Sequence, residues 1–255
     1  MSALIEFDEV CKYYQMGDTT VKAADHITMK IEKGEFVAIV GQSGSGKSTC
    51  MNIIGCLDVP TYGTYRLNGR DVGKMNRNEL AAVRNEMLGF IFQQYNLIPK
   101  LTVQENVELP LLYAGVSAEE RRERAIQSLE RVGLADKRKN LPSQLSGGMK
   151  QRAGIARAYT NNPEIMLMDE PFGAVDEITR GQLQDELLRI HRESGITVLF
   201  VTHDIAEALK LGTRTLVMDA GQIQQYDAPS RLLAHPATSF VERLVRRSRV
   251  FQTRA

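Results

Sequence analysis

Nine consecutive residues, 41–49, carry the combination of groups that binds a nucleoside triphosphate. They read GQSGSGKST and satisfy the pattern G-x-x-x-x-G-K-[ST]. In this pattern glycines let main-chain N–H groups turn toward the phosphates, the lysine reaches the β and γ phosphates, and the hydroxyl after it ligates Mg²⁺. We therefore expect the phosphates to lie against Gly41, Gln42, Ser43, Gly44, Ser45, Gly46, Lys47, Ser48 and Thr49.

The elements around this loop must hold it at the end of a strand. The apolar run 36–40 before the loop predicts a short buried strand, and 47–57 after it predicts a helix. That helix directs the positive end of its dipole at the phosphates. Because this strand–loop–helix order is the context that the pattern requires, we interpret the loop as a nucleotide site rather than as a glycine-rich turn.

Two adjacent carboxylates, Asp169 and Glu170, follow the apolar run 165–168, which predicts a buried parallel strand. A carboxylate at the end of that strand can hold magnesium through water, opposite the Ser48 hydroxyl. The next carboxylate can point at the γ-phosphate and orient or deprotonate an attacking water. The alternative is that both acids only cap the strand or pair with lysines.

Two further polar side chains also follow predicted strands. Gln93 comes after 88–92, and His203 comes after 196–201. The histidine can hydrogen-bond the γ-phosphate and hold Glu170 in place, and the glutamine can reach magnesium or water. Because the carboxyl ends of strands in an open parallel sheet line one crevice, we expect these groups to converge on the nucleotide.

A second anion site is predicted where Ser146, Gly147 and Gly148 open a helix that runs to about Tyr159, with the serine as its N-cap. Free N–H groups, the positive helix end and a hydroxyl all favour phosphate there. One chain has only one phosphate loop, so this helix needs the nucleotide of another chain. A head-to-tail pair with two-fold symmetry satisfies that requirement.

Composition limits the classes of function. The 255 residues carry a formal net charge of +1, which argues against a general nucleic-acid binder. The three cysteines form no C-x-x-C pair, so we expect reduced thiols with neither a disulfide nor a metal role. The longest apolar run, 109–116, contains Pro110 and is far shorter than the roughly 20 residues of a membrane span. We expect any membrane span to come from another chain.

Two features leave alternatives open. Tyr13 and Tyr14 are expected in a loop between the first two strands, either as ordinary packing or as an aromatic platform for a base. The segment 240–250 is rich in arginine. Such a tail forms either a solvated face or a lipid contact.

Taken in order, these motifs resemble those of the ATP-binding-cassette (ABC) ATPases over essentially the whole chain: 41–49, Gln93, 145–148, Asp169–Glu170, 174–176 and His203. The resemblance implies an α/β fold of the P-loop NTPase class. Its parts are a RecA-like parallel core sheet, an antiparallel β subdomain and an inserted α-helical subdomain. The implied limits are 1–93 and 161–235 for the core lobe, 94–160 for the helical subdomain and 236–255 for the tail.

The same resemblance implies the cofactors, partners and residue roles. It implies ATP and Mg²⁺, a second copy of the chain, and membrane-spanning permease subunits at the cytoplasmic face of the membrane, with no nucleic acid. Tyr14 resembles the adenine-stacking aromatic of the family. The residues expected to carry the reaction are Lys47, Gln93, Glu170 and His203, and those expected at Mg²⁺ are Ser48, Gln93 and Asp169. Those expected to contact the ATP of the partner chain are Ser146, Gly147, Gly148 and Asp176.

The sequence is compatible with more than one subfamily and more than one cargo. Residues 1–143 are similar to macrolide-export and lipoprotein-release ATPases, whereas the part from Gly148 on is similar to osmoprotectant (quaternary-amine) importers. The chain is therefore a natural intermediate or a hybrid of two parents. One rival function is an ATPase that transmits force and moves no cargo. Another is a non-transport ABC ATPase acting on DNA or ribosomes, which the absence of a long coiled coil and of a second cassette disfavours.

Overall fold

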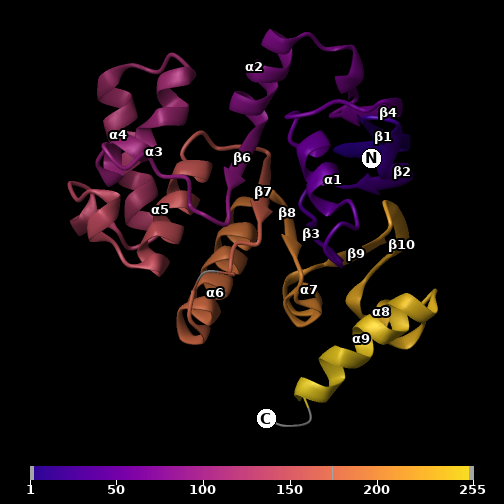
Figure 1. Cartoon of the computed structure of the whole chain (residues 1–255). Coiled ribbons are helices and arrows are strands. Elements are labelled where there is room, and N and C mark those ends of the chain that lie inside the picture. The colour runs from indigo at the N-terminus through magenta and orange to yellow at the C-terminus, as the bar shows by residue number, and fades with distance from the viewer. Residues whose placement is uncertain (1–2, 174, 253–255) are drawn as a thin grey trace. The chain divides into compact units, whose positions relative to one another are not determined.

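The computed structural model describes residues 3–173 and 175–252, and for 247–252 only the backbone is described (Figure 1). The chain packs into two units. The first comprises the chain up to Leu80 together with the part from Thr197 on, and the second is Ala81–Ile196. The domain limits expected from the motif resemblance stay a prediction. Ala174, part of the 174–176 motif, lies outside the described residues, as do the side chains of Arg247 and Arg249 in the tail.

The first unit contains an antiparallel sheet of strand order β2-β1-β4-β5. The four strands are β1 (Ile5–Met16), β2 (Thr19–Ile31), β4 (Tyr62–Leu67) and β5 (Arg70–Asp71), followed by the 3-10 helix η1 (Val72–Lys74). Phe7 and Tyr65 pack edge to face under this sheet, with ring centroids 4.8 Å apart. Tyr65 is fully buried, and its hydroxyl donates to the Ile54 carbonyl at 2.9 Å.

The same unit contains the strand that carries the glycine-rich loop. β3 (Phe36–Gly41) lies between β8 (Thr197–Thr202) and β9 (Arg214–Asp219) and runs parallel to both. All six residues of β3 and of β8 are buried, which is why β3 and the middle of β8, residues 198–201, read as apolar runs. β10 (Gln222–Asp227) closes this side as an antiparallel strand. The helices of the unit are α1 (Lys47–Ile54), α7 (Ile205–Leu211), α8 (Pro229–Ala234) and α9 (Ser239–Gln252).

The second unit holds one parallel strand pair and most of the helices. β6 (Leu88–Ile91) and β7 (Ile165–Asp169) run parallel, with Ile91 opposite Met168. Its helices are α3 (Val103–Tyr113), α4 (Ala118–Arg131), η2 (Ala135–Lys137), η3 (Pro142–Gln144), α5 (Gly147–Tyr159) and α6 (Glu177–Ser194). The division between the units falls within α2 (Arg77–Met87). This alternation of strands and helices confirms the predicted α/β class of the P-loop NTPases.

Two local predictions were wrong. Tyr13 and Tyr14 lie within β1, where Tyr14 pairs with Val21 of β2, and not in a loop. The strand continues because the turn comes only at residues 17–18. The helix expected over 47–57 ends at Ile54, since Gly55 caps it and Cys56 takes a left-handed φ of 53°.

Over residues 3–173 and 175–252, no helix combines the length and the apolar content needed to cross a bilayer.

Candidate nucleotide-binding site

The glycine-rich loop can exist only with glycine at its two anchoring positions. A Cβ on Gly41 would lie 2.3 Å from the Met218 carbonyl oxygen, and one on Gly46 would lie 2.2 Å from the Ala23 oxygen. Gly46 also has a φ of 96°, a conformation that side-chain-bearing residues rarely adopt. The loop is therefore packed closely against the main chain at Met218 and at Ala23.

The Lys47 side chain hydrogen-bonds to the main chain of this loop. Its Nζ donates to the carbonyl oxygens of Gly41 at 2.9 Å and Gln42 at 2.8 Å, and the side chain is 9% exposed. Ser48, the next residue, is exposed. Within the described chain, α1 has no side-chain cap and no acidic residue in its first turn. The N-terminus of α1 therefore presents a positive helix end beside a buried ammonium group, which favours an anion.

The Tyr14 side chain, on strand β1, is held by polar contacts. Its hydroxyl donates to Asp58 Oδ2 at 2.9 Å, and Lys12 Nζ lies 5.2 Å from the ring centroid. Partial burial and the hydrogen bond to Asp58 raise the pKa of Tyr14. The ring is 37% exposed. These contacts account for ordinary packing, so stacking on adenine stays a prediction.

His203 follows β8 at once, as expected, and is exposed. The residues around it are fixed by hydrogen bonds. Thr202 Oγ1 donates to Glu207 Oε2 at 2.8 Å, and the Asp204 carboxylate caps α7 by accepting from the Ala206 N–H at 2.8 Å. His203 thus lies in a turn between the buried strand β8 and helix α7, and hydrogen bonds hold the residues on both sides of it.

The second unit brings Gln93 and Glu170 into contact. They follow the adjacent parallel strands β6 and β7, and Gln93 Nε2 donates to Glu170 Oε2 at 3.2 Å. Glu170 has a left-handed φ of 44°, and its carbonyl accepts from the Gly173 N–H at 3.1 Å. A left-handed φ at a residue other than glycine is strained and is common at functional sites. Asp169 ends β7 directly before it.

Ser146 caps α5 as the sequence predicts. Its hydroxyl accepts from the Met149 N–H at 3.4 Å, and the side chain is exposed. Gly148 is required by packing, because a Cβ there would lie 2.5 Å from Thr179 Cγ2 on α6. The described part of α5 has no acidic residue in its first turn, so this end of the helix also favours an anion.

Asp176 caps its own helix, α6. Its carboxylate accepts from the Thr179 N–H at 3.0 Å and from the Thr179 hydroxyl at 2.7 Å. The hydrogen bond from the Thr179 N–H, followed by that from its hydroxyl, lowers the pKa of Asp176. The contact of Asp176 with a partner-bound nucleotide stays a prediction.

One contact near this site has no signal in the sequence. Gln151, 1% exposed on α5, donates from Nε2 to the Pro171 carbonyl at 2.7 Å. It therefore joins the helix that begins after Ser146 to the segment that follows Glu170. A glutamine inside a helix reads as a surface residue, so only the packed structure reveals this link.

Comparison with known proteins gives one consistent result. Residues 24–173 match the family model described as "ABC transporter". The chain is 50% identical over 201 residues to "Uncharacterized ABC transporter ATP-binding protein YknY" from Bacillus subtilis, which covers 79% of this chain and 87% of that protein. It is also 50% identical over 201 residues to "Macrolide export ATP-binding/permease protein MacB" from Hyphomonas neptunium, covering 79% of this chain but only 31% of that protein.

A solved structure shows the same fold. It is described as "Dimeric structure of a post-hydrolysis state of the ATP-binding cassette MJ0796 bound to ADP and Pi". It superposes with a TM-score of 0.81 at 42% identity, covering 88% of this chain and 98% of that one.

Proposed function

The chain belongs to the ABC transporter family and is an ATP-hydrolysing, ATP-binding protein of that family, and from this premise we propose how it works. Two copies close around ATP and drive a separate membrane permease from the cytoplasmic face of the membrane. The observation that carries the proposal is the phosphate loop, in which a buried Lys47 ammonium lies beside the uncapped end of α1. When ATP binds, the Lys47 ammonium exchanges its hydrogen bonds to the Gly41 and Gln42 carbonyls for contacts with the β and γ phosphates.

Mg²⁺ fits the donors that the chain offers. The Ser48 hydroxyl, the Gln93 amide oxygen and the Asp169 carboxylate are all oxygen donors, which magnesium prefers. When bound, the ion neutralises charge on the β and γ phosphates. We assign these three residues to holding it, with Ser48 as the direct protein ligand.

Glu170 is the proposed general base for the attacking water. Its contact with Gln93 supports this role, because the amide donates to one carboxylate oxygen at 3.2 Å and thereby orients the carboxylate. His203 is proposed to hydrogen-bond the γ-phosphate and to keep the water and Glu170 in line. A positioned base of this kind contributes a factor of about 10² to 10⁴ in rate.

The second copy supplies the other side of each nucleotide. Ser146, Gly147 and Gly148 begin a helix whose end favours an anion, and we propose that they bind the γ-phosphate held by the partner's loop. The dimeric state named for the solved relative supports this arrangement. Closure on ATP and reopening after hydrolysis then move the permease.

We propose that the cargo is exported, on the basis of the relatives named for macrolide export. The chain spans 31% and 34% of the length of two of those proteins. The importer resemblance from Gly148 on stays a prediction. Purifying the permease that binds this chain and measuring cargo movement in vesicles would separate export, import and force transmission without transport.

Glu170→Gln tests the central claim. We expect ATP binding to persist, ATP hydrolysis to fall by at least about 100-fold, and a dimer to accumulate with ATP in size-exclusion chromatography. Glu193→Gln is the matched control, because Glu193 is an exposed acid on α6 that pairs with Arg189 across one helix turn. Hydrolysis at the parent rate in Glu170→Gln would remove Glu170 from the role of base.

A further inference from the structure

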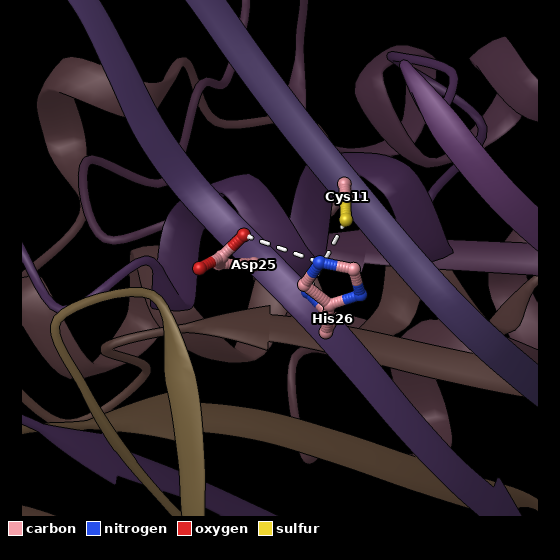
Figure 2. A group of neighbouring side chains, drawn as sticks. All are labelled: Cys11, Asp25 and His26. Carbon is pink, nitrogen blue, oxygen red and sulfur yellow. Dashed lines mark hydrogen bonds and ion pairs between the residues drawn. The ribbon is translucent and has the colours of Figure 1, made fainter.

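Three side chains with metal-binding atoms meet on the two long strands β1 and β2 of the first unit. Cys11 comes from β1, and Asp25 and His26 come from β2 (Figure 2). A sulfur, a carboxylate oxygen and an imidazole nitrogen from them all lie within 4.8 Å of one another. The described residues contain no second group of this kind. None of the three belongs to the phosphate loop or to the other residues assigned to ATP.

A bulge in the sheet creates this arrangement. Val10 pairs with Ile27 and Lys12 pairs with Ala24, so the single residue Cys11 faces the two residues 25 and 26. His26 has a left-handed φ of 54° at this point. In a regular strand neighbouring side chains point to opposite faces, whereas a bulge re-aims them. The bulge thereby lets Asp25 and His26, adjacent in the chain, both approach the Cys11 sulfur.

The spacing of the donor atoms approaches that of a tetrahedral zinc site. Zinc bonds of about 2.0 Å to nitrogen or oxygen and about 2.3 Å to sulfur place the ligand atoms about 3.3–3.6 Å apart. His26 Nε2 lies 3.9 Å from Asp25 Oδ1. Side-chain movements that shift the ligand atoms by less than about 1.5 Å therefore bring them to the spacing at which they can bind one zinc ion.

The imidazole is already oriented for this purpose. His26 Nδ1 lies 2.8 Å from Glu9 Oε2, and Thr28 donates to Glu9 Oε1 at 2.9 Å. A carboxylate that holds Nδ1–H leaves Nε2 as the lone-pair nitrogen on the side of Asp25, which is the usual support of a metal-binding histidine. Glu9 reaches this position through a second bulge, with a left-handed φ of 51°.

The Cys11 sulfur of this group is buried, whereas the His26 imidazole is accessible to solvent. Cys11 is 1% exposed, and its Sγ accepts the His26 main-chain N–H at 3.2 Å, which holds the sulfur beside His26. The His26 side chain is 62% exposed, so an ion can enter from solvent. Asp25 also accepts from Tyr13 and lies 3.6 Å from Lys22 Nζ, a cation that must move aside. Lys22 is 57% exposed and can do so.

We propose that Cys11, Asp25 and His26 bind one Zn²⁺, with water in the fourth position and Glu9 orienting the imidazole. Sulfur, imidazole and carboxylate ligands together select zinc over the magnesium that accompanies ATP. Binding releases the Cys11 thiol proton to solvent. The metal joins two neighbouring strands across their bulges and stabilises the folded protein by mass action.

The test uses Co²⁺ as a spectroscopic substitute for zinc, added to the full chain without nucleotide. We expect one equivalent to give the visible bands of a tetrahedral ion and a near-ultraviolet thiolate-to-cobalt band, both removed by added Zn²⁺. Cys11→Ser should abolish the thiolate band, and Cys56→Ser should keep it. A thiolate-to-cobalt band that survives Cys11→Ser would place the metal elsewhere and overturn the proposal. An octahedral cobalt spectrum without thiolate character would overturn it as well.

Substituting the buried Cys11 can itself disturb folding, so a second test uses variants at the exposed residues His26 and Glu9, which keep the sulfur in place. His26→Ala should weaken Co²⁺ binding at least about 100-fold, whereas His235→Ala, which removes an exposed imidazole elsewhere in the first unit, should leave it unchanged. Glu9→Gln should weaken it about 10-fold to 100-fold, against no change for Asp8→Asn, the exposed neighbouring acid. Equal affinities in either matched pair would contradict the assignment.

Discussion

Substituting Gly148 by alanine tests the packing that positions the α5 N-terminus. The new Cβ would meet Thr179 Cγ2 at 2.5 Å, where carbon atoms in contact normally lie about 3.5–4.0 Å apart. The threonine cannot simply rotate away, because its hydroxyl donates to Asp176 at 2.7 Å in the cap of α6. The substitution must therefore separate α5 from α6 or break this cap.

Two opposing free energies set the expected result. Overpacking by one methyl group costs about 1–3 kcal/mol of folding free energy, and alanine in place of glycine inside a helix gains up to about 1 kcal/mol. We expect Gly148→Ala to lower the free energy of unfolding by about 1–2 kcal/mol. In a Thr179→Ser background, which lacks Cγ2 but keeps the hydroxyl, the same substitution should instead raise the free energy of unfolding by up to about 1 kcal/mol. The coupling between the two sites should then be about 1–3 kcal/mol.

Urea unfolding of the four proteins of this double-mutant cycle measures the coupling. Gly154→Ala is the matched control, because Gly154 also lies on α5 and a Cβ there would meet nothing within 4 Å. It should raise the free energy of unfolding by up to about 1 kcal/mol. ATP hydrolysis should fall in Gly148→Ala and return in the double variant, since the α5 N-terminus is proposed to bind the partner's γ-phosphate.

The result that would refute this reasoning is specific. If Gly148→Ala lowers stability equally with threonine or serine at 179, the contact with Cγ2 does not carry the cost. If Gly148→Ala behaves like Gly154→Ala, the close approach of the two helices has no energetic consequence.

Three further predictions concern other parts of the molecule. Tyr65→Phe should lower the free energy of unfolding by about 1–2 kcal/mol in urea melts, because it removes the hydroxyl's hydrogen bond to the buried Ile54 carbonyl, to which the Cys56 thiol donates from 3.9 Å; no loss would show that the thiol or another group replaces the hydroxyl. The pKa of Asp176 is lowered chiefly by the Thr179 N–H, so the cap is complete above the ordinary pKa of about 3.9 and is lost as pH falls through the lower folded value. Acid unfolding should therefore be less pH-dependent in Asp176→Asn, and identical pH profiles would contradict this. Ser146→Arg should keep ATP binding in a calorimetric titration but lose ATP-dependent dimerisation and hydrolysis, whereas Ser143→Arg, at another exposed serine just upstream, should keep both; equal activities would remove the serine cap from the shared site.

Local patterns were sufficient for the elements that carry the phosphate loop and the acids. The apolar run before Gly41 is β3, the run before Asp169 is β7, and Ser146 caps α5. These predictions succeeded because each depends on contacts within a few residues: buried parallel strands are apolar throughout, and a serine N-cap needs only its own helix. Gln93 and Glu170 were expected to approach each other because both follow parallel strands, and they do.

Other features depend on residues far apart in the chain. The sequence places Tyr14 in a loop because nothing local shows that β1 continues to Met16, and that continuation rests on pairing with β2. The cysteine spacing argued against a metal site, since it counts only neighbours in sequence. Cys11 meets Asp25 and His26 through a bulge between two strands, and no motif describes that.

By itself, the sequence determined the α/β class, the glycine-rich loop after β3, the acids after β7 and the capped helix α5, and the resemblance of its motifs indicated an ABC ATPase. The tertiary structure decided that Gly148 faces Thr179, that Gln151 joins α5 to Pro171, and that Cys11 lies beside His26. The physical reason is one of range. Periodicity and capping act over one or two turns of chain, whereas packing and strand register join residues that only the folded chain brings together.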